Sequence, residues 1–86
     1  MKNLQGIVIL SNSLLGLYAV NMFEKDISII KKQGDAVLNI GDLITGDLDD
    51  PKAVFCYNET RREEIEISVE HVHCSIDDAL YRMGLK

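Results

Sequence analysis

Apolar and polar side chains alternate most regularly in the stretch EEIEISVEHVHC, residues 63–74. Up to Val69, its apolar residues alternate with glutamate and serine. A period of two places apolar side chains on one face of an extended chain, so this segment predicts a half-buried β-strand. Val72 then follows Val69 by three residues instead of two. We therefore expect a β-bulge near Glu70–His71, which would restore the alternation.

Shorter runs rich in β-branched and aromatic residues occupy most of the chain before that strand. Clusters of turn-forming residues separate them, at Ser11–Ser13, Gln33–Asp35 and Asp49–Lys52. Serine and aspartate side chains bond to nearby backbone in such clusters, and Pro51 fixes its own φ, so each cluster is typical of a turn. The runs between the turns predict strands at residues 4–10, 16–23, 27–32 and 53–58.

Residues 13–32 also fit a helix. Small or apolar residues recur there at spacings of four and three, at Gly16, Val20, Phe23, Ile27 and Ile30. This is the stripe of an amphipathic helix, and Ser13 could cap it. The many β-branched residues, and a glycine in what would be the first turn, favour instead an antiparallel hairpin with its loop at residues 24–26.

The stretch IGDLITGDLDD, residues 40–50, contains two Gly-Asp pairs, Gly41–Asp42 and Gly46–Asp47. Glycine accepts positive φ, so we expect a short strand that bends sharply at both ends, as at the corner of a barrel. A phosphate loop needs lysine after its second glycine, where Asp47 stands. The aspartates also lack the alternating ligand spacing of an EF-hand calcium loop. We therefore expect them to form turns.

The last segment predicts the one helix of the chain, at residues 75–84. Ser75 is suited to cap its start, two aspartates follow in the first turn, and Gly84 is suited to end it. Its apolar face consists of Ile76, Ala79, Leu80 and Met83. We expect this helix to close one end of the sheet.

These elements predict a mainly β protein. The fold class is a small curled antiparallel sheet or a five- to six-stranded barrel with one short C-terminal helix, because so small a sheet must curl to bury one face and protect its edges. Without repeats or a long linker, residues 1–86 are expected to form a single domain, with the barrel at 4–74 and the helix at 75–84.

Composition limits the partners of such a domain. The chain has 86 residues, 47% of them hydrophobic, and a net charge of −5. A domain of this size buries only about 60–65% of its unfolded surface, so a protein partner or self-association would stabilise it. Nucleic acid is disfavoured by the charge, since binding to phosphates normally requires a basic surface. The only adjacent basic residues that could form a local basic surface are the pairs Lys31–Lys32 and Arg61–Arg62.

The two cysteines and the N-terminal sequence bear on the compartment. Two cysteines are too few for a disulfide framework, which fits a reducing cytoplasm. The apolar N-terminal run resembles a signal sequence, but Gln5 and Ser11–Ser13 interrupt it, and it is too short to span a bilayer. We expect a cytoplasmic protein without membrane attachment.

Histidine and cysteine form the one group with candidate metal chemistry. His71 and His73 are two residues apart and would share a face of a strand, so Cys74 or Cys56 could complete a zinc site. The alternative is that both histidines are partly buried and hydrogen-bonded, with the cysteines as small core residues. Because no second short-spaced ligand pair exists, the second interpretation is favoured and no cofactor is expected. Adjacent strand residues face opposite ways, so a Cys74–His73 catalytic pair, and enzyme activity, are not expected.

The aromatic residues offer a second kind of site. On a curved sheet, Tyr18, Phe23, Phe55 and Tyr57 could stack on unpaired bases, with Lys31, Lys32, Arg61 and Arg62 contacting phosphates. Aromatic residues make up only 6% of the chain, however, and most of them are expected to belong to the core.

The stretch IGDLITGDL, residues 40–48, together with GLYAV at 16–20, resembles RNA-binding OB-fold domains of the ribosomal-protein type. The resemblance covers an aliphatic-Gly-Asp pattern of nine residues. It implies a five-stranded Greek-key barrel, OB- or SH3-like in size, with a ligand-binding face at residues 16–32. The chain departs from that pattern because it lacks surplus lysines and exposed aromatics, so the fold can be shared without the ligand.

From these features we expect a non-catalytic interaction module that binds protein, either a partner or a second copy. Binding of single-stranded nucleic acid is the alternative, and a structural zinc site is the second alternative.

Overall fold

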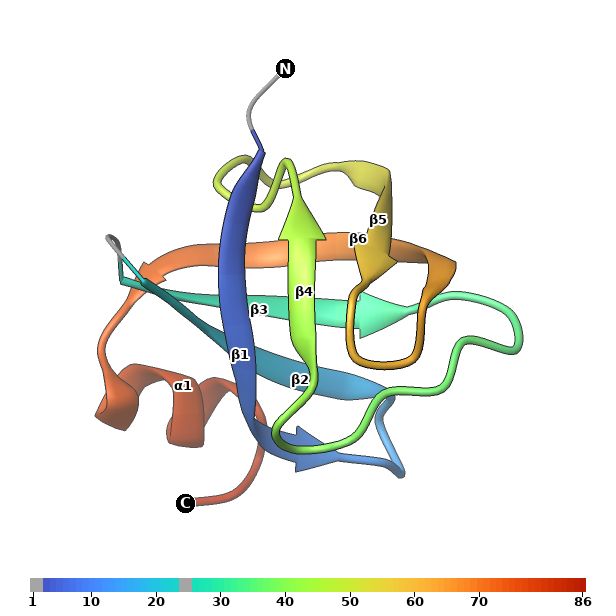
Figure 1. Cartoon of the computed structure of the whole chain (residues 1–86). Coiled ribbons are helices and arrows are strands. Elements are labelled where there is room, and N and C mark those ends of the chain that lie inside the picture. The colour runs from blue at the N-terminus through green and yellow to red at the C-terminus, as the bar shows by residue number, and fades with distance from the viewer. Residues whose placement is uncertain (1–2, 24–25) are drawn as a thin grey trace.

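The computed structural model describes residues 3–23 and 26–86. These residues form six strands and one helix, shown in Figure 1: β1 Leu4–Asn12, β2 Leu17–Met22, β3 Ile27–Lys32, β4 Leu43–Gly46, β5 Ala53–Asn58, β6 Glu63–Cys74 and α1 Ile76–Arg82. No helix within these two ranges has the length and apolar character needed to cross a bilayer.

The six strands close into a barrel in the order β1-β2-β3-β6-β5-β4, and every neighbouring pair is antiparallel. Strands β1 to β3 form a meander, and β4 returns to lie beside β1, which is the Greek-key order. Closure leaves each strand with two neighbours, so the sheet has no free edge. The predicted fold class, mainly β with a curled antiparallel sheet or a five- to six-stranded barrel and one short C-terminal helix, is confirmed, and the barrel has six strands.

Strands β2 and β3 pair as the predicted antiparallel hairpin, and the helical alternative is wrong. Strands β2 and β3 pair in register from Leu17 with Lys31 to Asn21 with Ile27. The helical spacing is a consequence of burial on both faces of these strands, which removes the simple alternation of apolar and polar residues. The predicted loop at residues 24–26 lies mostly outside the described residues.

Strand β1 is longer than predicted. It continues through Ser11 and Asn12, which pair with Tyr18 and Leu17. The turn therefore comes later, at residues 13–16. Serine and asparagine suggested a turn from their local chemistry, but pairing with β2 satisfies their backbone groups instead.

Strand β6 contains the predicted bulge. Ile30 pairs with Val69 and Ile29 pairs with His71, so Glu70 is the extra residue. A second irregularity follows, because Ile27 pairs with Cys74, and His73 has a φ of 56°. The left-handed conformation of His73 changes the direction of the strand before the helix.

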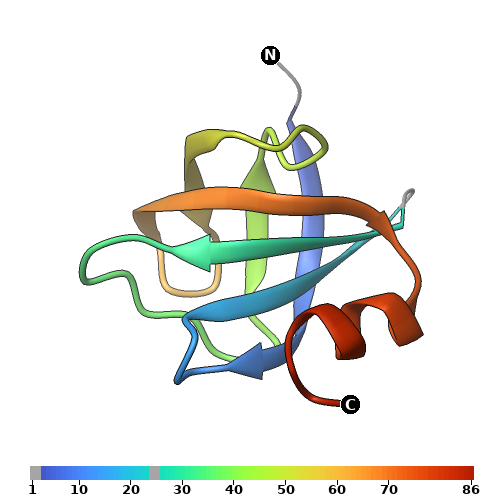
Figure 2. The ribbon, with the colours of Figure 1, turned by 180° about the vertical axis from the view of Figure 1, so that it is seen from behind.

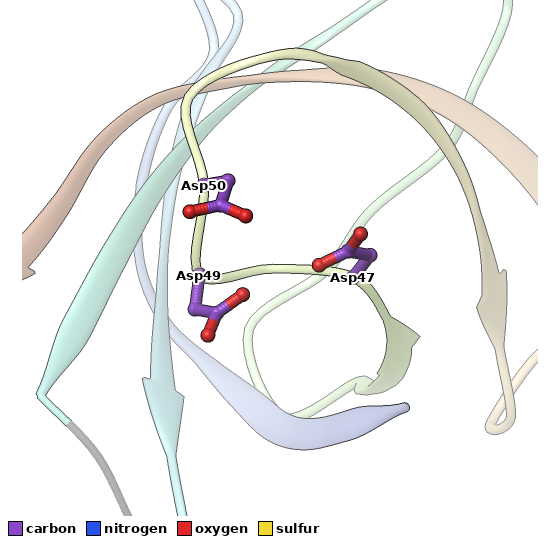
Figure 3. Close-up of side chains that lie close together, drawn as sticks. All are labelled: Asp47, Asp49 and Asp50. Carbon is purple, nitrogen blue, oxygen red and sulfur yellow. The ribbon is translucent and has the colours of Figure 1, made fainter. Parts of the chain in front are cut away.

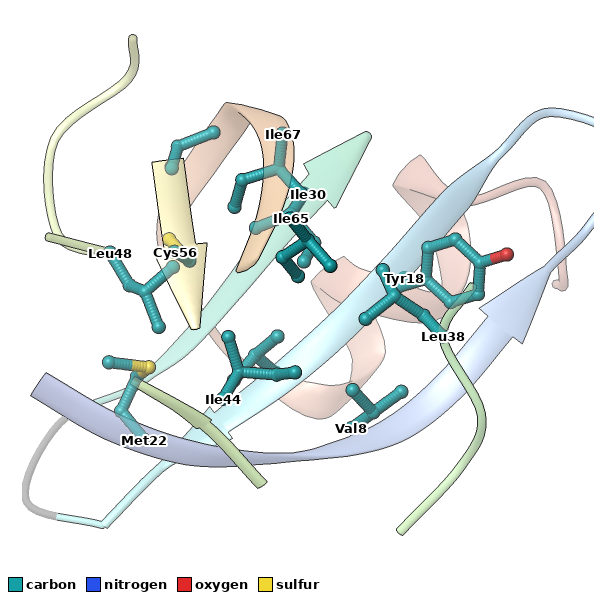
Figure 4. Close-up of a cluster of buried hydrophobic side chains, with 12 residues drawn as sticks. Val8, Tyr18, Met22, Ile30, Leu38, Ile44, Leu48, Cys56, Ile65 and Ile67 are labelled. Atoms are coloured by element: carbon teal, nitrogen blue, oxygen red, sulfur yellow. The ribbon is translucent and has the colours of Figure 1, made fainter. Parts of the chain in front are cut away.

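The barrel interior is the main hydrophobic core (Figure 4). Inward side chains from all six strands fill it, together with two from the loops. Its members are Val8, Tyr18, Val20, Met22, Ile30, Leu38, Ile44, Leu48, Cys56, Ile65, Ile67 and Val69. Gly46 is close to one of these side chains: a Cβ added there would lie 2.5 Å from Cys56 Sγ. Gly41 has the positive φ expected of a corner, at 98°, whereas Gly46 permits a close approach.

Helix α1 covers the outer face of β2 and β3, so the prediction that it closes one end of the barrel is wrong. Its Ala79 and Met83 pack with outward residues Ala19, Ile27 and Ile29 in a second buried cluster. The apolar outer face of β3 attracts the helix there, and Figure 2 shows it outside the barrel wall.

Both ends of the helix are fixed by polar contacts. Ser75 caps the start as predicted, since its Oγ accepts a hydrogen bond from the Asp78 amide at 3.2 Å. At the other end, Asn12 Nδ2 donates to the Met83 carbonyl at 2.7 Å. The end of β1 is thereby joined to the end of the helix.

Candidate interaction surfaces

Three of the four candidate aromatic residues are exposed, which corrects the expectation that most of them belong to the core. Phe23, Phe55 and Tyr57 expose 60%, 63% and 40% of their surface. Only Tyr18 is buried, at 5%, inside the barrel. The sequence AVFCYN contained the signal, because Phe55 and Tyr57 alternate with residues that face the interior.

Phe55 and Tyr57 lie on the outer face of the barrel opposite two glutamates. Phe55 pairs with Glu66 and Tyr57 pairs with Glu64 across β5 and β6. All four side chains are exposed. We name this set the aromatic–acidic face. Each exposed ring therefore has a carboxylate directly beside it, an arrangement that can receive a cationic group over a ring and near a negative charge.

A groove of about 350 Å³ adjoins this face. It is lined by Gln33–Ala36, Phe55 and Glu63–Glu66. The register explains its position, because Glu66 pairs with Phe55 on one side and its carbonyl accepts from the Gln33 amide at 3.0 Å on the other. The groove thus crosses β6 between strand β5 and the turn after β3. We name it the acidic groove.

The acidic groove carries four carboxylates, from Asp35, Glu63, Glu64 and Glu66. Within the described chain, the one cation paired with any of them is Arg61, whose Nε lies 3.2 Å from Glu63 Oε1. The groove therefore has an excess of negative charge around one exposed phenyl ring. Phosphate groups would be repelled from it.

Leucines form a second exposed apolar surface, at the turn that joins β1 to β2. Leu14 is 97% exposed and Leu15 52%, while Leu85, after the helix, is 42% exposed. The turn lies against the helix end, since a Cβ added at Gly84 would lie 3.8 Å from Leu15 Cδ1. We name Leu14, Leu15 and Leu85 the leucine end. Exposed leucines that lie close together are candidates for an interaction surface.

The residues proposed for nucleic-acid contact are distributed over separate parts of the barrel. Lys31 is exposed on β3 opposite Ser68, and Lys32 is half-buried. Arg61 and Arg62 lie in the turn between β5 and β6. Tyr18, the proposed stacking ring, points into the barrel and cannot stack on a base.

The candidate zinc ligands are also separated. Cys56 lies in the barrel core, whereas Cys74 lies in the cluster beneath α1. His73 Nδ1 is 3.7 Å from Asp26, and His71 Nδ1 is 3.4 Å from Arg82. The interpretation of the cysteines as small core residues matches these positions, but His73 is exposed, because the bulge reverses the expected direction of its side chain.

Burial controls the chemistry of both thiols. It raises the pKa of the Cys56 thiol to about 11, with a smaller contribution from the negative charge of Asp47. Burial likewise raises the pKa of Cys74. A thiol is nucleophilic only as the thiolate, so the raised pKa values lower the reactive fraction of both cysteines near neutral pH.

Aspartates of the Gly-Asp stretch perform two structural roles. Asp42 is 5% exposed, and one carboxylate oxygen accepts hydrogen bonds from the Asn39 amide at 3.0 Å and from Asn58 Nδ2 at 2.9 Å. This fixes the turn before β4, as expected. Asp47, Asp49 and Asp50 gather in the loop after β4 (Figure 3), the one group of this kind among the described residues that could hold a metal ion.

Lys52 lies among these three aspartates. Its ammonium forms an ion pair with Asp47 and lies 3.8 Å from Asp50. The side-chain hydrogen bond to Asp47 raises the pKa of Lys52, so the lysine stays charged. Lys52 thus offsets part of the negative charge of this loop.

Comparison of this chain with protein-family models, with curated proteins and with solved structures gives no match.

Proposed function

We propose that this protein is a non-catalytic interaction module whose ligand is protein, and that it associates with a second copy of itself through the leucine end. The observation that carries the proposal is the exposure of Leu14, almost complete at 97%, beside two further exposed leucines. Burying such side chains contributes about 1.5–3 kcal/mol each, which favours contact with another apolar surface.

The size of the domain supports the same proposal. Eleven large hydrophobic side chains are exposed among the described residues, although the chain has only 86 residues. A small barrel gains stability when association removes such surface from water. Because Leu15 lies close to Gly84, the residue before Leu85, two copies can bury the leucine end against each other about a twofold axis.

The absence of a catalytic role is part of the proposal. The described histidines contact charged residues on the surface, and both cysteines are buried in separate clusters. A nucleophile needs a neighbouring base within hydrogen-bond reach, and neither thiol has a histidine in that position in the described chain.

Light scattering during size-exclusion chromatography tests the proposal. We expect a molar mass above the 9.7 kDa of one chain, rising with concentration. Leu14→Ser/Leu15→Ser is expected to return the mass to that of one chain. Val37→Ser/Ile40→Ser, which changes two other exposed apolar residues, is the matched control and is expected to associate normally. A strict monomer at about 1 mM would contradict the proposal.

Single-stranded RNA binding by an OB-like barrel is the second candidate. Its support is the Greek-key order of the strands and the exposure of Lys31. It ranks lower because Tyr18 is buried and the acidic groove repels phosphates. Binding of mixed oligonucleotides at low salt, weakening steeply as salt is added and weaker for Lys31→Ala, would favour it. No binding under those conditions would end it.

A further inference from the structure

We infer that the acidic groove binds a lysine or arginine side chain from an extended segment of a partner protein. The inference rests on the proposed role as an interaction module, but it concerns a different surface from the leucine end. Among the described residues, no element covers the outer face of β5 and of the β6 segment that pairs with it, residues 63–68, whereas α1 covers that of β2 and β3; the uncovered face combines exposed rings with carboxylates.

Charge complementarity identifies the occupant. The groove has four carboxylates, and in the described part of the chain Arg61, which lies outside the lining, pairs with one of them, Glu63. Asp35, Glu64 and Glu66 therefore offer negative charge to a ligand. An acidic or phosphorylated segment would be repelled, and a purely apolar one would remove these carboxylates from water without compensation. A cationic side chain satisfies both conditions.

Phe55 adds a specific contact for such a cation. Its ring is 63% exposed beside Glu66, and it lines the same groove. A lysine ammonium or an arginine guanidinium over an aromatic face is attracted by the ring, and its aliphatic stem can cover the ring at the same time. The groove thus selects a long basic side chain over a small monovalent ion.

The spacing of the acceptors favours an extended segment. Glu64 and Glu66 are two residues apart on β6, as are Phe55 and Tyr57 on β5. Side chains on one face of a strand repeat about every 6.6–6.8 Å, and alternate residues of an extended peptide have the same repeat. Two basic residues separated by one residue therefore match the two ring–carboxylate pairs.

Fluorescence anisotropy with a labelled peptide, Ala-Lys-Thr-Lys-Ala with blocked ends, tests the inference at low salt. We expect saturable binding that the same peptide with acetylated lysines does not show. Glu64→Gln/Glu66→Gln is expected to weaken binding about five- to tenfold, as the loss of two charge pairs implies. Phe55→Leu, which keeps an apolar side chain but removes the ring, is expected to weaken it about two- to fivefold.

Glu59→Gln/Glu70→Gln is the matched control, because it removes two exposed acids outside the groove and gives the same net charge. Equal weakening by both double variants would show attraction to overall charge and would overturn the inference. So would equal binding of the acetylated peptide, or no binding to the wild-type protein at millimolar concentration.

The outcome is separable from that of the proposed function. If the protein associates through the leucine end but binds no lysine peptide, only the groove inference fails. If Glu64→Gln/Glu66→Gln instead abolishes self-association, the groove holds a second copy, and the inference of a separate partner is overturned. If the peptide binds to a strict monomer, the leucine end is not an interface while the groove assignment holds.

Discussion

The outer face of β2 and β3 and the outer face of β5 and β6 are built on the same barrel but differ in what covers them. On the first, Ala19, Ile27 and Ile29 are buried beneath helix α1. On the second, Phe55 and Tyr57 are exposed, and each has a glutamate opposite. A helix packed on the second face would bury carboxylates without partners. The comparison indicates that the charges beside the apolar residues decide which outer face of the barrel is covered by an element of the same chain.

The largest difference is expected between Ile29→Ala and Phe55→Ala. Ile29 is fully buried, so its truncation leaves a cavity and should lower the free energy of unfolding by about 2–5 kcal/mol. Phe55 is mostly exposed, and its truncation should cost at most about 1 kcal/mol. Urea unfolding of the two variants measures both values. Similar losses would mean that the β5–β6 face is also covered.

The inner side of β5, unlike its exposed outer side, should not tolerate an added methyl group. Gly46→Ala is expected to lower the free energy of unfolding by about 1–3 kcal/mol, because its new methyl group would meet Cys56 Sγ on the inner side. In a protein that already carries Cys56→Ala, and so lacks this sulfur, Gly46→Ala should lower the free energy of unfolding by less than it does in the wild-type protein. A full additive loss in the double-mutant cycle would exclude this contact.

The attachment of α1 to the covered face should depend on Asn12. Asn12→Ala removes the hydrogen bond to the Met83 carbonyl and should cost about 0.5–1.5 kcal/mol. Amide exchange at the end of the helix should accelerate, while the amides of β5 should keep their protection. Faster exchange throughout the barrel would show that the two faces are not energetically distinct.

A pH dependence of stability is expected in the alkaline range. The pKa of Cys56 is about 11 in the folded protein against 9.0 for an ordinary thiol, so the unfolded chain loses this proton first as pH rises. The unfolded state then binds fewer protons, and stability falls from about pH 9 to 11. Unfolding at a series of pH values should show a shallower fall for Cys56→Ala. An unchanged slope would mean that Cys56 is accessible to water.

Sequence patterns predicted the elements of the barrel well, but they did not predict which element covers each outer face of the barrel. The alternation in β6, its bulge at Glu70 and the cap at Ser75 depend on neighbouring residues alone, so they could be read directly. The position of α1 could not, because it depends on which outward faces remain apolar after the barrel closes. The helical spacing at residues 16–30 was misleading for the same reason, since burial on both faces conceals a period of two.

The candidate surfaces were harder to predict than the fold. The alternation in AVFCYN places Phe55 and Tyr57 on the outer face, against the general preference of aromatic residues for the core. Their pairing with Glu66 and Glu64 depends on register between two strands, which no local pattern contains. The proximity of Leu15 to Gly84 likewise arises only from the tertiary arrangement of the helix.

A map of amide chemical shifts during addition of the lysine peptide tests the central claim most directly. If the uncovered face receives a basic segment, the changes will concentrate at residues 33–36, 55–57 and 63–66. The amide chemical shifts of β2, β3 and α1 will not change. Changes centred on β2, β3 or α1, or spread evenly over the acidic surface, would contradict the account.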